Sequence, residues 1–347
     1  MKFLIIRLSS LGDVVLTTPV LRCLKAQLPD VELHYLVRSS FKSAVINNPH
    51  ITKLHLYNED RNSMVEELKE EKFDYIIDLH RNMRSFRIKN ALKVPAFSFK
   101  KLNFRKLIFT KLKWNVMPGQ LHVIDRYLKT VEPFGVYNDG AGMDYFIAPN
   151  EEVEQSDIPA SHHAGYIGIV IGASFYTKRL PVYKLQELCT KIDHPIILLG
   201  GPGDAAAGEE IKKVDSVKVY NACGKFSLNE SADLIRRAKL IIAHDTGLMH
   251  IAAALKKQVI AVWGSTTPSF GMYPYYGANF LSHQVTQPYD DMQVHKLWCR
   301  PCTKIGRRKC PQGHFKCMKR LSIDELVMKV NERSSNTVIS TGMIRPA

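Results

Sequence analysis

Two short stretches decide the fold, Ser9-Ser10-Leu11-Gly12-Asp13 and His244-Asp245-Thr246-Gly247-Leu248-Met249-His250. Each follows an apolar run that is typical of a buried strand, and each opens a helix. In an open α/β sheet such turns lie at the carboxyl ends of the strands, where ligands bind. We therefore expect the two stretches to face each other across a cleft, the first carrying a base and the second binding a nucleotide.

Strand-like and helix-like segments alternate on both sides of a polar stretch at residues 151–163. This alternation predicts parallel sheets with helices on both faces. We expect two doubly wound α/β domains at residues 1–155 and 156–330, followed by the end of a helix and a tail at 331–347. The length of 347 residues suits two such domains, since a domain takes roughly 150 residues.

The formal net charge of +15 is concentrated in two stretches without Asp or Glu, residues 81–113 and 296–320. This concentration favours an anionic partner, which is nucleic acid, a membrane surface, or a phosphorylated or carboxylated substrate. The alternative is a solvated surface that keeps the protein in solution. No run approaches the ~18–20 apolar residues that cross a bilayer, so we expect a cytoplasmic protein.

The second half carries several features of a phosphate-binding site. Small residues end its strands, as at Ser174, and let a ligand approach the backbone. The helix that begins at Thr246-Gly247 offers free N–H groups and a positive dipole end to a pyrophosphate. Lys178 would supply a mobile cation, and His250, one turn into the helix, would point the same way.

Each of these features has a plainer alternative. Asp204, at the end of a glycine-rich turn, would accept bonds from ribose hydroxyls, as an acid does in dinucleotide folds; the alternative is a simple turn. Asp245 is equally suited to capping the helix that follows it. His250 is also typical of a hydrogen-bonded core histidine. The combination is more specific than any one member.

With these residues in place, the chain resembles the bacterial lipopolysaccharide heptosyltransferases, glycosyltransferase family 9, over about residues 1–330. The resemblance rests on three stretches: Arg7-Leu8-Ser9-Ser10-Leu11-Gly12-Asp13 with Thr17-Thr18-Pro19, the run from Asp245 to Ala254 with Val262-Trp263-Gly264-Ser265-Thr266, and Cys-Pro-Gln-Gly-His-Phe-Lys-Cys-Met at 310–318. It implies a GT-B fold, in which two Rossmann-like domains face a central cleft. The first domain would bind a lipid-linked acceptor and the second a nucleotide sugar, typically ADP-heptose.

The resemblance also implies an inverting reaction that needs no metal, with Asp13 as the general base. The residues expected to contact the nucleotide sugar are Ser174, Lys178, Asp204, Phe226, Asp245, Thr246, Gly247 and His250. Those expected on the acceptor side are Gly12, Arg81 and Arg84. The turn at 200–204 and the stretch at 174–176 depart from the family pattern, so a different donor sugar or acceptor glycan stays an alternative.

A base in such a transfer must lie within ~2.6–3.2 Å of the acceptor hydroxyl, and a carboxylate on a rigid turn meets this need. The alternative is that Asp13 only caps the helix after it. The acceptor would be an anionic glycolipid at the inner face of the cell membrane, opposite the basic stretch at 81–113. Aromatic residues interleaved with these cations suit peripheral lipid contact or a core equally well: Phe97, Phe99, Phe104, Phe109 and Trp114.

The cysteine segment Cys299-x2-Cys302, Cys310-x3-His314-x2-Cys317 has spacing compatible with a tetrahedral zinc site. A structural zinc ion held by the four cysteines is one interpretation, and a loop of free thiols is the other. The family resemblance adds no support for a metal.

Two other classes of protein fit less well. A nucleic-acid-binding protein would explain the basic charge, but the chain lacks the expected zinc-finger spacing and aromatic sheet signature, so no nucleic acid is expected as a partner. A nucleotide-sugar enzyme without transfer, such as an epimerase, should open with G-x-G-x-x-G. The first loop here is Ser-Ser-Leu-Gly-Asp instead.

Overall fold

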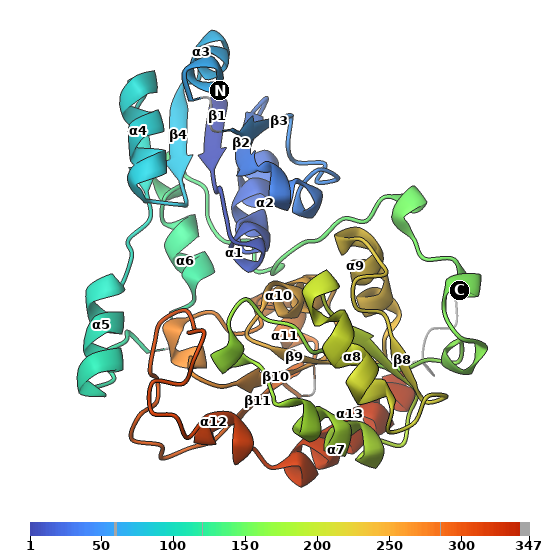
Figure 1. Ribbon diagram of the computed structural model, residues 1–347. Coiled ribbons are helices and arrows are strands. Elements are labelled where there is room, and N and C mark those ends of the chain that lie inside the picture. Colours follow the sequence, from blue (N-terminus) through green and yellow to red (C-terminus); the bar gives the residue numbers. More distant parts are fainter. Residues whose placement is uncertain (59–60, 120, 285, 341–347) are drawn as a thin grey trace.

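The computed structural model describes residues 1–58, 61–119, 121–284 and 286–340. Two parallel sheets, one from each half of the chain, lie one above the other with helices against their faces (Figure 1). This arrangement confirms the prediction of two α/β units. No helix in the described part of the chain combines the length and the hydropathy needed to span a bilayer.

The first sheet has the strand order β3-β2-β1-β4-β5 and is parallel throughout its described strands. Its central strand β1 is a continuous apolar run because helices cover both faces of the sheet. The strands are β1 (Lys2–Ile6), β2 (Glu32–Arg38), β3 (Lys53–Tyr57), β4 (Tyr75–Asp78) and β5 (Ala96–Ser98). The helices of this half are α1 (Leu11–Val15), α2 (Thr18–Gln27), α3 (Arg61–Glu70), α4 (Met83–Leu92), α5 (Asn103–Leu112) and α6 (Val123–Leu128).

The second sheet has the order β11-β10-β9-β6-β7-β8 and is also parallel. Its strands are β6 (Ile167–Val170), β7 (Ile196–Leu199), β8 (Val219–Asn221), β9 (Leu240–His244), β10 (Val259–Trp263) and β11 (Tyr289–Gln293). Its helices are α7 (Val182–Lys191), α8 (Ala205–Lys212), α9 (Leu228–Arg237), α10 (Gly247–Ala254), α11 (Ala278–Ser282), α12 (Lys316–Lys319) and α13 (Ile323–Ser340).

Strand order reverses between β1 and β4 in the first sheet and between β6 and β9 in the second. At such switch points the loops leave the sheet in opposite directions and open a crevice at the carboxyl ends of the strands. The loop after β1 and the first turn of α1 hold Ser9 to Asp13, and the loops after β6 and β9 hold Ser174 and Asp245. The sequence prediction therefore selected loops at both switch points.

The structure differs from the sequence prediction in several elements. Apolar residues at helical spacing predict one helix over residues 14–28. The structure splits it into α1 and α2, because Pro19 needs a first-turn position and the hydroxyls of Thr17 and Thr18 donate to the last carbonyls of α1. The sequence also predicts a terminal helix over 322–333, and this helix runs on to Ser340, since no glycine or proline interrupts it. Helix α4 and strand β11 were not predicted. The limits at 155 and 330 stay predictions, and residues 341–347 of the predicted tail lie outside the described residues.

Substitution of Ile77 tests the pairing of β4 with β1. It is fully buried in β4 opposite Ile5 of β1. We expect Ile77→Ala to lower the free energy of unfolding by about 2–5 kcal/mol, because it removes packed methyl groups and leaves a cavity. Leu56→Ala, on the edge strand β3 with 39% of the residue exposed, should change stability by only about 0.5 kcal/mol. Denaturant unfolding measures both, and equal losses would contradict the described sheet.

Candidate functional site

A cavity of about 510 Å³ opens between the two halves of the molecule, at the carboxyl ends of both sheets. Residues of the loops after β1, β6 and β9 line it, together with residues near α5 and α6. The sequence-predicted site residues on its wall are Gly12, Asp13, Ser174, Lys178, Asp245, Thr246, Gly247 and His250. The predicted acceptor-side and donor-side stretches thus meet in one cavity.

The two stretches lie in direct contact where α1 runs against α10. A Cβ on Gly12 would lie 2.6 Å from His250 Cδ2, and one on Gly247 would lie 2.6 Å from Leu11 Cδ2. Neither distance is compatible with a side chain, so glycine is needed at both positions for close approach. The sequence suggests that Gly12 permits a tight turn, but Gly12 is not among the glycines with positive φ. Its close contact with His250 explains the glycine instead.

Asp13 is held as an ionised carboxylate. Arg7 Nη2 lies 2.7 Å from Asp13 Oδ1, and Ser10 donates to Oδ2 from its backbone N at 3.2 Å and its Oγ at 2.7 Å. Burial raises the pKa of Asp13, but the charge of Arg7 and the Ser10 hydrogen bonds outweigh burial and leave that pKa below its usual 3.8. Asp13 therefore caps α1 and also faces the cavity with lone pairs to spare.

The opposite wall is built around the first turn of α10. Its first N–H groups have no acceptor within the helix, and Thr246 and Gly247 line the cavity. Lys178 Nζ lies 2.7 Å from Asp245 Oδ2 and donates to Asp245 O at 3.1 Å. Thr266 Oγ1 donates to the same carboxylate at 2.8 Å. Asp245 thus fixes Lys178 beside a helix N-terminus, an arrangement that binds anions.

His250 lies between the two turns with only 1% of its surface exposed. Its Nδ1 is buried without a hydrogen-bond partner among the described residues. Burial lowers the pKa of His250 to about 4, although the charges of Asp245 and Asp13 act in the opposite direction. His250 is therefore neutral at neutral pH, and its ring offers an N–H to a ligand without adding a formal charge.

Four cations that sequence reasoning did not single out also line the cavity: Lys101, Lys106, Arg126 and Lys304. None of them forms an ion pair with a carboxylate in the described part of the chain, whereas Asp13 and Asp245 each have a cation of their own. Burial, with the charge of Arg126 second, lowers the pKa of Lys106 to about 8. The basic stretches at 81–113 and 296–320 predicted a surplus of positive charge. They did not predict that these four side chains would line the cavity.

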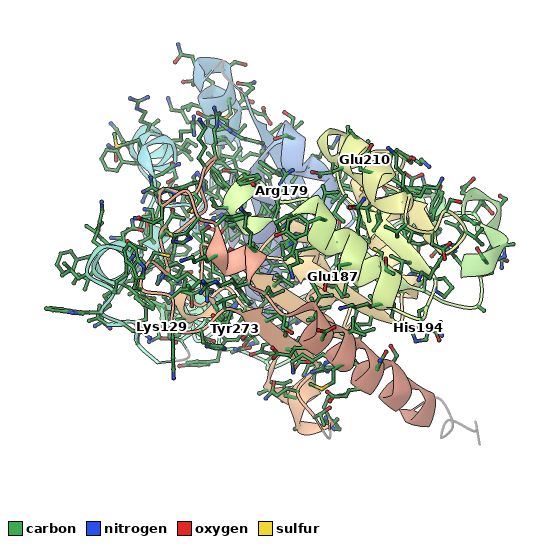
Figure 2. All side chains as sticks on the ribbon, turned by 60° about the horizontal axis from the view of Figure 1, so that its bottom comes forward. Lys129, Arg179, Glu187, His194, Glu210 and Tyr273 are labelled. Carbon is green, nitrogen blue, oxygen red and sulfur yellow. The ribbon has the colours of Figure 1, made fainter. Side chains whose placement is uncertain are left out.

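The remaining predicted residues lie outside the cavity wall. Asp204 accepts from Arg179 Nη1 (labelled in Figure 2) at 2.8 Å and from the Gly201 amide at 3.0 Å, so both of its oxygens have partners. Phe226 packs, half-buried, against the main hydrophobic core. Arg81 donates to Phe99 O at 2.8 Å, and Arg84 is exposed on α4. Their roles as ligand contacts stay predictions.

The two basic stretches touch each other through Lys113. Lys113 Nζ, just after α5, donates to the carbonyl oxygens of Cys299 and Pro301 at 3.1 and 2.9 Å. Figure 1 shows α5 beside the loop that precedes α12. A helix of the first half is thereby tied to a loop of the second.

Cys299, Cys302 and Cys310 of that loop, and Cys317 in α12, are free thiols. Cys299 Sγ lies 3.7 Å from His314 Nε2. Ligand atoms of three metal-binding side chains gather within 4.8 Å of one another at a different place in the described residues, His34, His55 and Glu71. The zinc site predicted from the cysteine spacing is therefore not preformed in this geometry.

Comparison with known proteins identifies the family to which this sequence is similar. The sequence model of the family described as Glycosyltransferase family 9 (heptosyltransferase) matches residues 61–311. The lipopolysaccharide heptosyltransferase 1 of Campylobacter coli is 27% identical, over 78% of this chain and 85% of its own. The lipopolysaccharide heptosyltransferase 2 of Salmonella typhimurium is 25% identical, over 78% of this chain and 84% of its own.

Solved structures share the fold. The E. coli ADP-heptose lps heptosyltransferase II has a TM-score of 0.72 and 19% identity, covering 97% of this chain and 99% of that one. A glycosyl transferase family 9 protein from Veillonella parvula has a TM-score of 0.75 and 21% identity, with 96% and 97% covered. The E. coli heptosyltransferase WaaC, solved with ADP-2-deoxy-2-fluoro heptose, has a TM-score of 0.68 and 18% identity, with 96% and 99% covered. The predicted GT-B fold is confirmed.

Lys106 gives a pH-dependent prediction. The pKa of Lys106 falls from the usual 10.5 to about 8 in the folded protein, so between these values the unfolded chain binds more protons and stability rises with pH. We expect Lys106→Met to melt at a higher temperature than the wild type at pH 7, because it removes a partly buried charge that has no carboxylate partner and only the ring of Phe270, 5.2 Å away, beside it. The gap should close as the pH rises from about 8 toward 10.5.

Thermal melts across this pH range measure the gap. Lys111→Met, on the exposed face of the same helix, is the matched control and should show no gap that closes with pH. If the difference in melting temperature between Lys106→Met and the wild type widens above about pH 8, the lowered pKa of Lys106 is contradicted.

Proposed function

Because the chain belongs to glycosyltransferase family 9, and is a glycosyltransferase of the lipopolysaccharide heptosyltransferase type, we propose that it moves a heptose from ADP-heptose to an anionic lipopolysaccharide-core acceptor with inversion at the anomeric carbon. The observation that carries the proposal is the meeting of Asp13 and the α10 N-terminus in one cavity. One supplies a carboxylate base and the other an anion site.

The donor would lie with its diphosphate on the second half of the molecule. The E. coli neighbour WaaC holds ADP-2-deoxy-2-fluoro heptose, and we transfer that donor chemistry to this cavity. Lys178, the first-turn amides of α10 and the neutral His250 would contact the diphosphate. Ser174 lies on the same wall. Asp204 and Phe226 are proposed to contact the ribose and the base after a local rearrangement, since neither lines the cavity.

In the proposed reaction the acceptor hydroxyl oxygen forms a bond to the anomeric carbon while the bond from that carbon to the diphosphate oxygen breaks. The hydroxyl proton passes to the carboxylate of Asp13. The electron pair of the broken bond leaves with ADP, and its negative charge is met by the α10 amides and Lys178. Arg7 keeps Asp13 ionised before the reaction, and no metal is needed in any step.

The acceptor would occupy the part of the cavity that belongs to the first half. Lys101, Lys106 and Arg126 of the first half, with Lys304 reaching the cavity from the second half, supply positive charge without a carboxylate partner, which suits a substrate with carboxylates or phosphates. Arg81 and Arg84 lie beyond the wall and are proposed to contact more distant parts of the glycan.

We also propose that the protein touches an anionic membrane beside the cavity. Phe104 and Leu107 of α5 are 75% and 52% exposed, and Trp114 and Trp298 are 67% and 70% exposed. Lys113, which follows α5, contacts Cys299, so the two tryptophans flank one contact between the halves. Aromatic side chains among cations suit the interface of an anionic bilayer. Phe99, in contrast, is part of the core.

A structural zinc ion at Cys299, Cys302, Cys310 and Cys317 is a separate proposal, independent of the transfer. Its support is the spacing of the cysteines and the contact of Cys299 with His314. Zinc analysis of the purified protein, with Cys302→Ser and Cys310→Ser combined as the control, tests it.

Substitution of Asp13 tests its proposed role as the general base. We expect Asp13→Ala to lower turnover by about 10²- to 10⁴-fold, since a general base is lost, while ADP still raises the melting temperature. Glu230→Ala is the matched control, because Glu230 caps α9 through the Ser227 amide at 2.6 Å, as Asp13 caps α1. It should lose similar stability and keep turnover. Near-normal transfer by Asp13→Ala would remove Asp13 as the base.

The donor is tested separately by thermal shift with nucleotides. ADP at about 100 times its Kd should add about 2.7 kcal/mol of stability, and Lys178→Met should remove most of this gain. A larger gain with another nucleoside diphosphate would replace ADP in the proposal.

Membrane contact is tested with lipid vesicles. We expect the protein to sediment with anionic vesicles, less so at high salt because screening weakens the attraction, and weakly with neutral ones. Phe104→Ser combined with Trp114→Ser should reduce sedimentation. Val217→Ser, at a remote site that is 73% exposed, is the control. Equal binding by all three proteins would contradict the proposed surface.

A further inference from the structure

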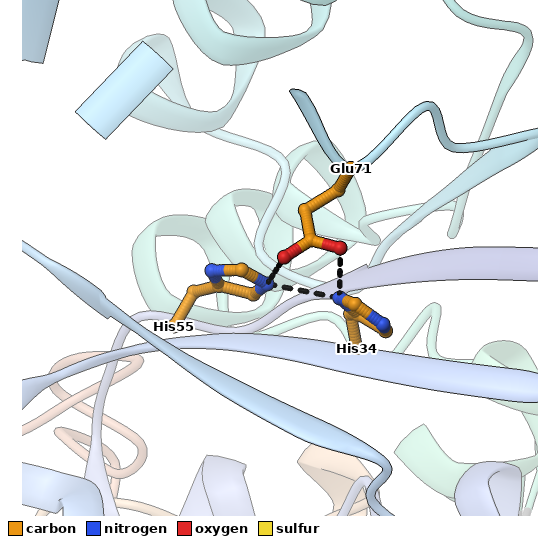
Figure 3. A group of neighbouring side chains, drawn as sticks. All are labelled: His34, His55 and Glu71. Atoms are coloured by element: carbon orange, nitrogen blue, oxygen red, sulfur yellow. Dashed lines mark hydrogen bonds and ion pairs between the residues drawn. The ribbon is translucent and has the colours of Figure 1, made fainter. Parts of the chain in front are cut away.

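A second group of ligand-type side chains lies in the first half, away from the cavity. His34 and His55 are each the third residue of their strands, β2 and β3, and Glu71 directly follows α3. The three side chains point toward one another (Figure 3). His34 Nδ1 lies 2.9 Å from His55 Nε2, and Glu71 Oε2 and Oε1 lie 3.7 and 3.9 Å from these two nitrogens.

The protonation of His55 is set by its other neighbour. His55 Nδ1 lies 2.9 Å from Glu67 Oε1, and because a carboxylate only accepts, the proton resides on Nδ1. The lone pair of His55 Nε2 therefore faces His34 and Glu71. A histidine whose far nitrogen donates to a carboxylate is the usual arrangement around a protein-bound metal.

Burial prepares His34 for the same role. Both imidazoles are 2% exposed, and the ring of Phe73 packs edge-on against them, with centroids 5.2 Å from His34 and 6.2 Å from His55. In the described geometry His34 Nδ1 donates to the lone pair of His55 Nε2 at 2.9 Å. With its proton on Nε2 instead, the neutral ring of His34 would offer a lone pair toward the same point.

Two lysines now neutralise Glu71. Lys53 Nζ contacts Oε1, and Lys2 Nζ lies 3.5 Å from Oε2. The Lys53 side chain is 52% exposed, so it is able to swing into solvent when another cation approaches the carboxylate. Lys53 is therefore a competitor for Glu71 in this group.

We propose that His34, His55 and Glu71 form a binding site for a divalent cation of the Zn²⁺ type. Two imidazole nitrogens and one carboxylate oxygen suit zinc, with water in the fourth position. The ion would join β2, β3 and the connection from α3 to β4, and Glu67 would orient His55. The site is remote from the cavity, so the proposal is independent of the proposed function and the ion would act on stability.

Zn²⁺ titration of metal-free full-length protein tests the site. We expect a raised melting temperature and one saturable Zn²⁺ that is still bound by the Cys302→Ser, Cys310→Ser double variant, in which the cysteine site proposed above is removed. Co²⁺ bound there should give the visible absorption bands of a four-coordinate site with nitrogen and oxygen ligands. Glu71→Gln and His55→Gln should abolish this binding. Glu67→Gln, which loses the orienting carboxylate, should weaken it by about 10- to 100-fold.

Lys53→Gln separates a metal site from a purely structural cluster. It removes the competing cation, so Zn²⁺ should bind more tightly than to the wild type, whereas a cluster built only for hydrogen bonding predicts no gain. Cys302→Ser combined with Cys310→Ser should leave the binding unchanged. The absence of one-to-one binding by the cysteine variant, the survival of that binding when Glu71→Gln is added, or weaker binding by Lys53→Gln would each overturn the proposal.

Discussion

The close approach of α1 and α10 is the constraint on which the rest of the site depends. The two helices begin at the switch points of different sheets, and they meet only because Gly12 and Gly247 carry no side chain. A methyl group at Gly12 would clash with the His250 ring and one at Gly247 with the Leu11 side chain, so either would disturb the contact that holds Asp13 near the α10 N-terminus. The two stretches thus form a direct contact between the halves rather than the walls of an open cleft. The cavity lies beside this contact.

The charged residues around the α1–α10 contact fall into two groups, ion pairs and cations without an acidic partner. Each acid on the cavity wall is paired within its own half, Asp13 with Arg7 and Asp245 with Lys178. These pairs hold their side chains in fixed positions and leave little net charge. The positive field of the cavity therefore comes from cations that have no acid beside them, and it is available to an anionic ligand rather than to the protein.

The sequence predicts most of the sheets and half of the site because both depend on local signals. Apolar runs such as β1 mark buried strands, and glycine with a carboxylate marks the turns that hold Asp13 and Asp245. Strand β11 was missed because Tyr289-Asp290-Asp291-Met292-Gln293 is polar, as an edge strand allows. Local patterns do not predict how distant segments pack. They therefore give neither the pairing of Asp204 with Arg179 nor the place of Lys304 on the cavity wall.

An anion bound beside Lys106 would couple ligand binding in this cavity to proton uptake. With a pKa of about 8, its amine is only partly protonated in the free protein at mildly alkaline pH. An anion placed beside it favours the charged form, so each binding event draws a fraction of a proton from the solution. The heat of binding then contains the ionisation heat of the buffer and differs between phosphate and Tris. Affinity for anions falls as the pH rises through this range, although Asp13 does not titrate there.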